Sequence, residues 1–176
     1  MDGGRAVLTE QDIHQALTRI SAEIAQRNPS PAKLALVGLP TRGVTLAQRI
    51  AAELHQSTGI QIPVGQIDIT FHRDDLELRR PIPHVTDVPF DITDRVIILV
   101  DDVLYTGRSV RAALNALNDL GRPEAIQLAT LIDRGHRRLP IAADYIGQTV
   151  PTEFADHVSV KVKEVDGRDA VEVQKA

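Results

Sequence analysis

Apolar residues recur at helical spacing near the start of the chain, which predicts an amphipathic helix. Its apolar face would be formed by Ile13, Leu17, Ile20 and Ile24. Thr9 is a suitable N-cap, and Asp12 follows at the capping-box position, so the helix is expected to begin there. The pair Asn28-Pro29 ends the pattern.

Uninterrupted apolar runs follow, and each reads as a strand buried on both faces of a parallel sheet. These runs are residues 34–39, 96–100 and 125–132, and weaker strands are expected at 60–71 and 143–146. Helical patterns follow the first two runs, at 44–55 and from Gly107 to Gly121. This alternation predicts an α/β fold with a mostly parallel central sheet flanked by helices.

The C-terminal part has a different pattern. Val158, Val160 and Val162 alternate with polar residues, Asp166-Gly167 is a turn signal, and a return strand follows it. We therefore expect a single domain over 1–176 in which residues 150–176 form a small hood subdomain. Residues 72–91 are long, charged and proline-bearing, which is typical of a functional loop.

Composition narrows the function classes. The 176 residues are 43% hydrophobic, enough for one domain with a substantial core. There is no cysteine, which excludes disulfides and thiolate metal sites and fits a reducing compartment. We find no apolar segment of membrane-spanning length, so a soluble, cytoplasmic protein without a membrane partner is expected. The net charge of −4 argues against a uniformly basic nucleic-acid binder and leaves a local basic face open.

The strongest chemical signal is residues 96–109, where an aliphatic strand ends in Asp101-Asp102 and a Thr-Gly turn leads into a helix. Backbone N–H groups at a helix N-terminus bind phosphate, and adjacent carboxylates accept hydroxyls or a metal ion. Two other interpretations fit the same residues: an ordinary strand-to-helix turn capped by Thr106 or Ser109, and a Mg²⁺ site of another phosphotransferase.

Residues 97–109 resemble the phosphoribosyl-pyrophosphate (PRPP) signature of the type I phosphoribosyltransferases. The resemblance implies that Asp101 and Asp102 hold the ribose hydroxyls and that the following loop holds the 5′-phosphate. The signature residues after the acids are Val103, Leu104, Tyr105, Thr106, Gly107, Arg108 and Ser109. It also implies Mg²⁺ as a cofactor, held mainly through PRPP and not by a dedicated set of protein ligands.

Tyr105 occupies the variable position of this signature. Hypoxanthine-type members of the family have an aspartate there, close to the purine N7. A phenol is not an equivalent proton partner, because its pKa is ~10. The residue therefore argues against a purine or xanthine substrate.

Two further segments match parts of that family. The loop Pro40-Thr41-Arg42-Gly43 corresponds to the pyrophosphate loop, often with a non-proline cis peptide, which implies that Thr41 and Arg42 bind pyrophosphate. The 72–91 segment corresponds to a loop that closes over the active site, where Arg73, Arg79 or Arg80 would neutralise pyrophosphate, and Arg80 is the one we favour. Without the resemblance, both segments read as solvated loops.

The run Asp133-Arg134-Gly135-His136-Arg137-Arg138, followed by Leu-Pro and Ala-Asp-Tyr, resembles a bifunctional branch of the family. Members of that branch convert uracil and PRPP to UMP and pyrophosphate, and attenuate the pyrimidine operon by binding leader mRNA when a uridine nucleotide (UMP or UTP) is bound. The resemblance implies uracil near Arg134 and the backbone of Val158, and assembly into homodimers or higher homo-oligomers. The candidate RNA-binding residues are Thr18, Arg19, His136, Arg137 and Arg138.

The candidate RNA-binding residues are also consistent with a few solvated side chains or with a subunit interface. Two alternative functions are a non-catalytic, nucleotide-sensing RNA regulator and a purine or xanthine phosphoribosyltransferase, which Tyr105 disfavours. The intact acids and pyrophosphate loop favour catalysis.

Overall fold

The computed structural model describes residues 4–69 and 86–176. In chain order the strands and helices are β1 (Arg5–Leu8), α1 (Glu10–Arg27), β2 (Leu34–Gly38), α2 (Arg42–Thr58), β3 (Val64–Gln66), β4 (Val96–Leu104), α3 (Arg108–Asn118), β5 (Ala125–Asp133), β6 (Tyr145–Thr149), β7 (His157–Lys161), α4 (Lys163–Asp166) and β8 (Ala170–Gln174). A 3₁₀ turn, Pro31–Lys33, precedes β2. Most of the predicted active-site loop, with Arg80, lies outside the described residues.

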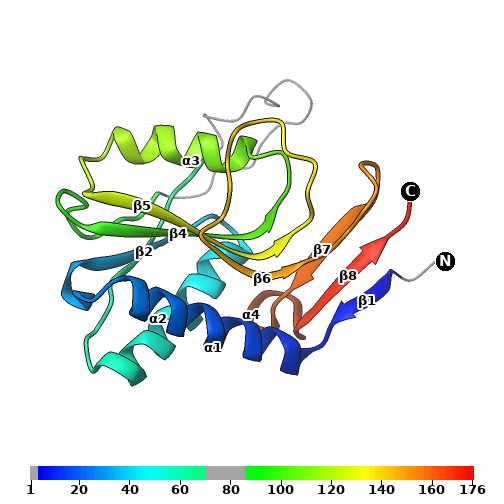
Figure 1. Cartoon of the computed structure of the whole chain (residues 1–176), viewed down its shortest axis with the longest axis horizontal. Helices are drawn as coiled ribbons and strands as arrows, with labels where there is room; N and C mark the ends of the chain where they lie inside the picture. The colour runs from blue at the N-terminus through cyan, green and yellow to red at the C-terminus, as the bar shows by residue number, and fades with distance from the viewer. Residues whose placement is uncertain (1–3, 70–85) are drawn as a thin grey trace.

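A five-stranded parallel sheet in the order β3-β2-β4-β5-β6 forms the centre of the molecule. Helices α1 and α2 cover one face and α3 covers the other (Figure 1). All five residues of β2 are buried, as expected of a strand covered on both faces. The predicted α/β class with a parallel sheet flanked by helices is therefore confirmed.

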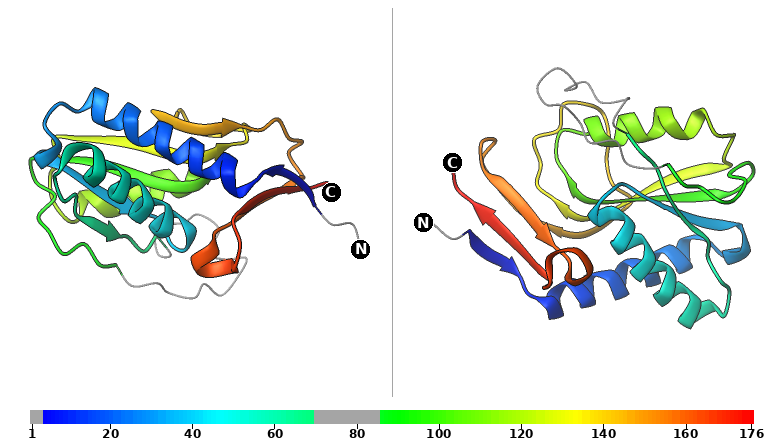
Figure 2. Two further views of the ribbon diagram at one scale, coloured as in Figure 1. Left: turned by 90° about the horizontal axis from the view of Figure 1, so that it is seen from below. Right: turned by 180° about the vertical axis from the view of Figure 1, so that it is seen from behind.

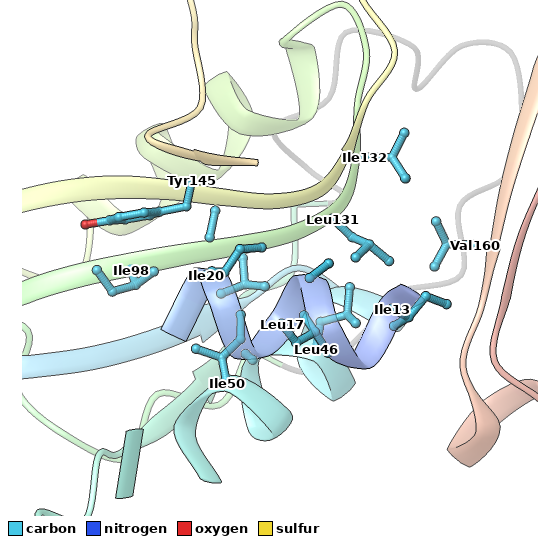
Figure 3. Packing of buried hydrophobic residues seen from close by; sticks show 14 of the residues in the cluster. Ile13, Leu17, Ile20, Leu46, Ile50, Ile98, Leu131, Ile132, Tyr145 and Val160 are labelled. Carbon is cyan, nitrogen blue, oxygen red and sulfur yellow. The ribbon is translucent and has the colours of Figure 1, made fainter. Parts of the chain in front are cut away.

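Two apolar clusters fill the space between these layers. The larger lies between the sheet and α1 and α2, and Figure 3 shows Leu17, Ile20, Leu46 and Ile98 meeting there. The same cluster continues to Val160 at the C-terminal end of the chain. The smaller cluster joins α3 to the opposite face of the sheet. Helix α1 begins with the expected capping box, in which Thr9 and Asp12 exchange hydrogen bonds.

The hood is a three-stranded antiparallel sheet in the order β1-β8-β7. The predicted C-terminal hairpin supplies β7 and β8, with the single-turn helix α4 between them. The third strand, β1, comes from the N-terminus and was not predicted. The described N-terminal strand and the C-terminus therefore lie together at the hood end of the molecule (Figure 2).

Several predicted boundaries were wrong. Helix α2 begins at Arg42, two residues before the expected start, so Arg42 lies in its first turn. Strand β4 continues to Leu104, because the residues after Val100 still pair with β5. Within residues 60–69, the described part of the strand expected over 60–71, only β3 is a strand, although Ile67 and Ile69 beyond it are buried.

Two other limits also moved. Helix α3 ends at Asn118, and β6 begins at Tyr145. Within the described ranges, no helix is long and apolar enough to cross a bilayer.

Candidate active site

The site is built where the carboxyl ends of β2 and β4 lie side by side. The strands pair in parallel up to Gly38 and Val100, and the Leu39 N–H donates to the Val100 carbonyl at 2.9 Å. Gly43, in the first turn of α2, lies against the same strand end. A Cβ built on Gly43 would be 2.6 Å from the Val100 oxygen, so only glycine lets α2 begin so close to β4.

Asp101 and Asp102 lie at this strand end, where open α/β sheets bind ligands. Asp101 is buried and Asp102 is half-buried. Their carboxylates accept hydrogen bonds from the next backbone N–H groups, at 2.9 Å from Asp102 N to Asp101 Oδ1 and 2.9 Å from Val103 N to Asp102 Oδ1. These bonds fix the carboxylates beside the turn that follows.

An open pocket of about 370 Å³ lies beside these acids. It is lined by Asp101, Val103, Leu104, Tyr105, Thr106, Gly107, Arg108, Ser109, Val110 and Phe154. The structure thus brings together every signature residue from 101 to 109 except Asp102, which adjoins the lining residues. The pocket also includes Phe154, a residue that the sequence did not single out.

The turn at Gly107 leaves the start of α3 open towards this pocket. Gly107 has φ 92°, a conformation that glycine adopts without steric cost. No side chain of the described residues caps α3, and Thr106 Oγ1 accepts only a long 3.4 Å bond from Arg108 N. A turn closed by a conventional side-chain N-cap is therefore wrong for this position. The first N–H groups of α3 remain available to an anion.

The second helix start at the site is also uncapped within the described residues. Thr41 precedes α2 without a side-chain cap, and the peptide between Pro40 and Thr41 is cis, as the resemblance implied. Arg42 donates to Asp166 of the hood through two bonds, 3.0 Å from Nε to Oδ2 and 2.7 Å from Nη2 to Oδ1. This hydrogen-bonded pair raises the pKa of Arg42, to which Asp102 adds a smaller attraction, and lowers the pKa of Asp166.

Tyr105 joins the pocket to the hood. Its hydroxyl donates to the Phe154 carbonyl at 2.8 Å, and its ring lies 5.4 Å from the Phe154 ring. The Arg134 guanidinium lies 4.0 Å from the centre of the Tyr105 ring. Phe154 itself is 50% exposed, an unusual state for one of only three phenylalanines in the chain. A lone phenylalanine in the polar segment 151–157 is the sequence signal that could have pointed to this residue.

Comparison with known proteins fits this geometry. Residues 4–164 match the phosphoribosyl transferase domain. Bifunctional protein PyrR of Deinococcus radiodurans is 56% identical over 169 residues, covering 95% of this chain and 92% of that protein. Its namesake in Halalkalibacterium halodurans is 53% identical over 174 residues, covering 97% of each. This chain belongs to the PyrR family of phosphoribosyl transferases.

Solved structures extend the likeness to the wider fold. A hypoxanthine phosphoribosyltransferase from Staphylococcus aureus matches with a TM-score of 0.73 at 16% identity, over 97% of this chain and 92% of that one. The Trypanosoma cruzi enzyme of the same name also gives 0.73, at 15% identity, over 96% and 95%. At such identities the likeness shows the fold alone. The type I phosphoribosyltransferase fold expected for this PyrR-family chain is confirmed.

Arg134 was expected near uracil; its guanidinium lies against the Tyr105 ring that lines the pocket, and its terminal nitrogens hold the hood backbone. They donate to the Asp156 carbonyl at 2.8 Å and to the Glu153 carbonyl at 2.9 Å. The side chain is buried, and neither it nor Val158 lines the 370 Å³ pocket. Val158 pairs with Val173 inside the hood sheet. Arg134 therefore fixes the segment that carries Phe154.

The loop after β5 contains three of the expected RNA-binding residues, and two of them make contacts inside the protein. Arg137 donates to the Tyr105 carbonyl at 2.7 Å, to the Ile141 carbonyl at 2.9 Å and to the Asp133 carboxylate at 2.7 Å. His136 Nε2 lies 2.7 Å from the Thr152 carbonyl. Arg138 is exposed, with its guanidinium 5.1 Å from the centre of the Phe154 ring. Arg138 is thus the most accessible of the three.

Thr18 and Arg19 are exposed on α1, on the opposite face of the sheet from α3 (Figure 1). Thr18 makes a long 3.4 Å hydrogen bond to Glu53 on α2. Arg19 donates to the carbonyls of Ile146 and Gly147 on β6. The chain therefore presents the expected RNA-binding residues as two separate groups.

The residues at the strand end also have the chemistry that Mg²⁺ requires. Phosphoribosyltransferases generally use Mg²⁺ with PRPP. No group of three or more metal-ligating side chains occurs in residues 4–69 and 86–176. Mg²⁺ usually binds through one or two carboxylates together with substrate phosphates. Asp101 and Asp102 fit a Mg²⁺ ion that is held mainly by substrate oxygens.

Proposed function

We propose that this PyrR-family protein transfers the phosphoribosyl group of PRPP to uracil, forming UMP and pyrophosphate. We also propose that it binds pyrimidine-operon leader mRNA in response to a uridine nucleotide in the same pocket. The observation that carries the proposal is the pocket beside Asp101 and Asp102, which opens onto the uncapped start of α3. Family membership supports both activities.

The 5′-phosphate of PRPP binds at the start of α3. Backbone N–H groups of residues 107–109, the Thr106 and Ser109 hydroxyls and the helix dipole favour a dianion there. This anchor is remote from the bond that breaks, so its binding energy orients the ribose for reaction. Asp101 and Asp102 accept hydrogen bonds from the ribose hydroxyls.

Pyrophosphate leaves towards the start of α2. The ribose C1 becomes oxocarbenium-like as its bond to pyrophosphate breaks, so fixed charges contribute more than a covalent intermediate. Arg42 and the Thr41 backbone bind the departing anion, while the carboxylates of Asp101 and Asp102 stabilise the positive ribose. When bound, Mg²⁺ supplies additional positive charge to the pyrophosphate oxygens.

The base occupies the end of the pocket formed by Tyr105 and Phe154. Their rings provide an apolar surface on which a planar base stacks. Position 105 offers a phenol whose hydroxyl already donates to the Phe154 carbonyl, so it supplies no carboxylate for a purine imidazole. This arrangement favours uracil over hypoxanthine.

RNA binding uses the exposed basic side chains outside the pocket. Arg138 lies next to Phe154 and can respond to what the pocket holds, while Thr18 and Arg19 offer a second contact surface on α1. His136 and Arg137 support that loop from inside. Because one subunit presents two groups, a homo-oligomer would let RNA contact both types of surface.

The decisive experiment is incubation of the protein with labelled uracil, PRPP and Mg²⁺, with hypoxanthine and orotate in parallel. We expect UMP to form from uracil, and no nucleotide to form from hypoxanthine or orotate. Asp102→Asn should reduce kcat by about 10²-fold or more, because a charge that stabilises the transition state is lost. Asp119→Asn, an exposed carboxylate at the other end of α3, is the matched control and should leave the rate unchanged.

Failure to form product with any base would contradict the enzymatic part of the proposal. Binding of UMP and leader RNA by such an inactive protein would identify it as a nucleotide-sensing regulator. Full activity in Asp102→Asn would refute the role of the acids.

A further inference from the structure

Two arginines of α2 dock the hood onto the main sheet. Arg42 and Arg49 are seven residues apart, about two helical turns, so they project from the same side of α2. Arg42 holds Asp166 through its Nε and Nη2. Arg49 holds Asp169 at 2.7 and 2.8 Å and also contacts Glu164. Each arginine therefore forms a fork with carboxylates of α4 or the turn after it.

These two forks differ in what surrounds them. Arg49 lies in the interior of α2 and takes no part in the candidate active site. Arg42 lies in the first turn of α2, next to the uncapped Thr41. Its guanidinium is also attracted electrostatically by the carboxylate of Asp102. Only the Arg42 fork therefore stands at a position where an anionic ligand is expected.

A carboxylate and a phosphoryl group bind a guanidinium through the same hydrogen-bond geometry. Both accept two parallel N–H donors in one plane, and the strongest arrangement is the bidentate fork. The Nε–Nη2 edge of Arg42 already makes this fork with Asp166. A pyrophosphate oxygen pair cannot use that edge until Asp166 leaves it.

We propose that Asp166 competes with pyrophosphate for Arg42. In the free protein Asp166 occupies the guanidinium, PRPP displaces it on binding, and Asp166 retakes Arg42 as pyrophosphate departs. Asp166 thereby weakens pyrophosphate binding and speeds product release. This inference rests on the proposed function, which places the pyrophosphate subsite at Arg42.

The exchange is local because the hood has other attachments. Asp166 Oδ2 also accepts a 2.8 Å bond from the Val162 N–H, so the carboxylate keeps a partner in its own segment after Arg42 moves. The Arg49 fork keeps α4 docked on α2. Tyr105 and Arg134 hold the other end of the hood through backbone carbonyls. The Arg42–Asp166 contact can therefore open without undocking the hood.

The test is the affinity of the full-length protein for Mg²⁺-pyrophosphate, measured by calorimetry. Asp166→Asn should bind it about three- to tenfold more tightly, the range expected when a partly exposed ion pair no longer competes. Product inhibition by pyrophosphate should strengthen by the same factor. Asp166→Ser, which also removes the charge, should behave alike and guards against a folding defect of one variant.

Asp169→Asn is the matched control, because it breaks the Arg49 fork in the same hood segment. It should lower the melting temperature and leave pyrophosphate affinity unchanged. Unchanged or weaker binding in both Asp166 variants would overturn the competition, and would make Asp166 a residue that positions Arg42.

Arg42→Gln separates this inference from the function beneath it. If pyrophosphate binds the wild type and Arg42→Gln equally, Arg42 is not part of the pyrophosphate subsite. Both the proposed subsite and the competition by Asp166 are then refuted. If binding depends on Arg42 but not on Asp166, only the competition is refuted. In the double variant that combines Arg42→Gln with Asp166→Asn, the increase in pyrophosphate affinity caused by Asp166→Asn should disappear.

Discussion

Gly43→Ala should move the start of α2, which carries the candidate pyrophosphate residues, away from the acids at the end of β4. Gly43 is where the first turn of α2 meets the end of β4. An added Cβ would lie 2.6 Å from the Val100 carbonyl oxygen and 3.4 Å from the Asp101 Cα. Both of these neighbours are backbone atoms, so no side chain can rotate away to make room.

The size of the effect follows from this distance. Carbon–oxygen contacts are normally about 3.3–3.6 Å, so the start of α2 must move by roughly 0.7–1 Å. Overpacking of this kind costs about 1–3 kcal/mol of stability, or about 2–12 °C in Tm for a chain of this length. A displacement near 1 Å at a reacting centre costs about 10²-fold in rate. We therefore expect kcat/KM to fall about 10- to 100-fold.

The assay is steady-state UMP formation with PRPP varied, together with a thermal melt of each variant. Gly59→Ala is the control at the other end of α2. Gly59 has φ 72° with nothing within 4 Å of an added Cβ, so the substitution strains the backbone by about 1–2 kcal/mol without moving the site. Wild-type kcat/KM and Tm in Gly43→Ala would refute the argument that α2 is clamped against β4. Equal activity losses in both variants would attribute the effect to general destabilisation.

Arg137→Gln should destabilise the protein by about 1.5–3 kcal/mol and lower UMP formation, since it removes charged hydrogen bonds that brace the phosphate loop. Arg138→Gln should instead preserve stability and weaken leader-RNA binding in a filter-binding assay; the reverse pattern would contradict our assignment. Tyr105→Phe removes the bond to the Phe154 carbonyl and should raise KM for uracil several-fold, for a net loss of about 1 kcal/mol. An unchanged KM would show that this bond does not shape the base site. The pKa of Asp169 is lowered by its hydrogen bonds to Arg49, so its stabilising effect is present above its ordinary value of 3.8 and is lost as pH falls through the lowered value. Melting temperatures should therefore show no pH dependence from Asp169 between pH 5 and 8, where its full stabilising effect is present, and a loss below about pH 4, which is smaller in Asp169→Asn.

Local signals in the sequence were sufficient for the elements that carry the chemistry. The capping box at Thr9, the aliphatic runs of β2, β4 and β5, and the acids followed by Thr-Gly all depend on residues close together in the chain. Backbone propensity and hydrophobic periodicity act over the same short range. Boundaries were less accurate where pairing decided them, as in β4, which continues past Val100 because β5 lies beside it.

What only the tertiary structure decided are contacts between distant segments. Arg42 and Asp166 are 124 positions apart, and no local pattern indicates that they form a pair. Strand β1 joins the hood because β8 offers an edge for pairing, and Arg134, the candidate base contact, also holds the hood backbone from 22 positions away. The sequence by itself determined which chemical groups the protein has and which short elements hold them. Folding determined which of those groups meet, because long-range packing and hydrogen bonding depend on the whole chain.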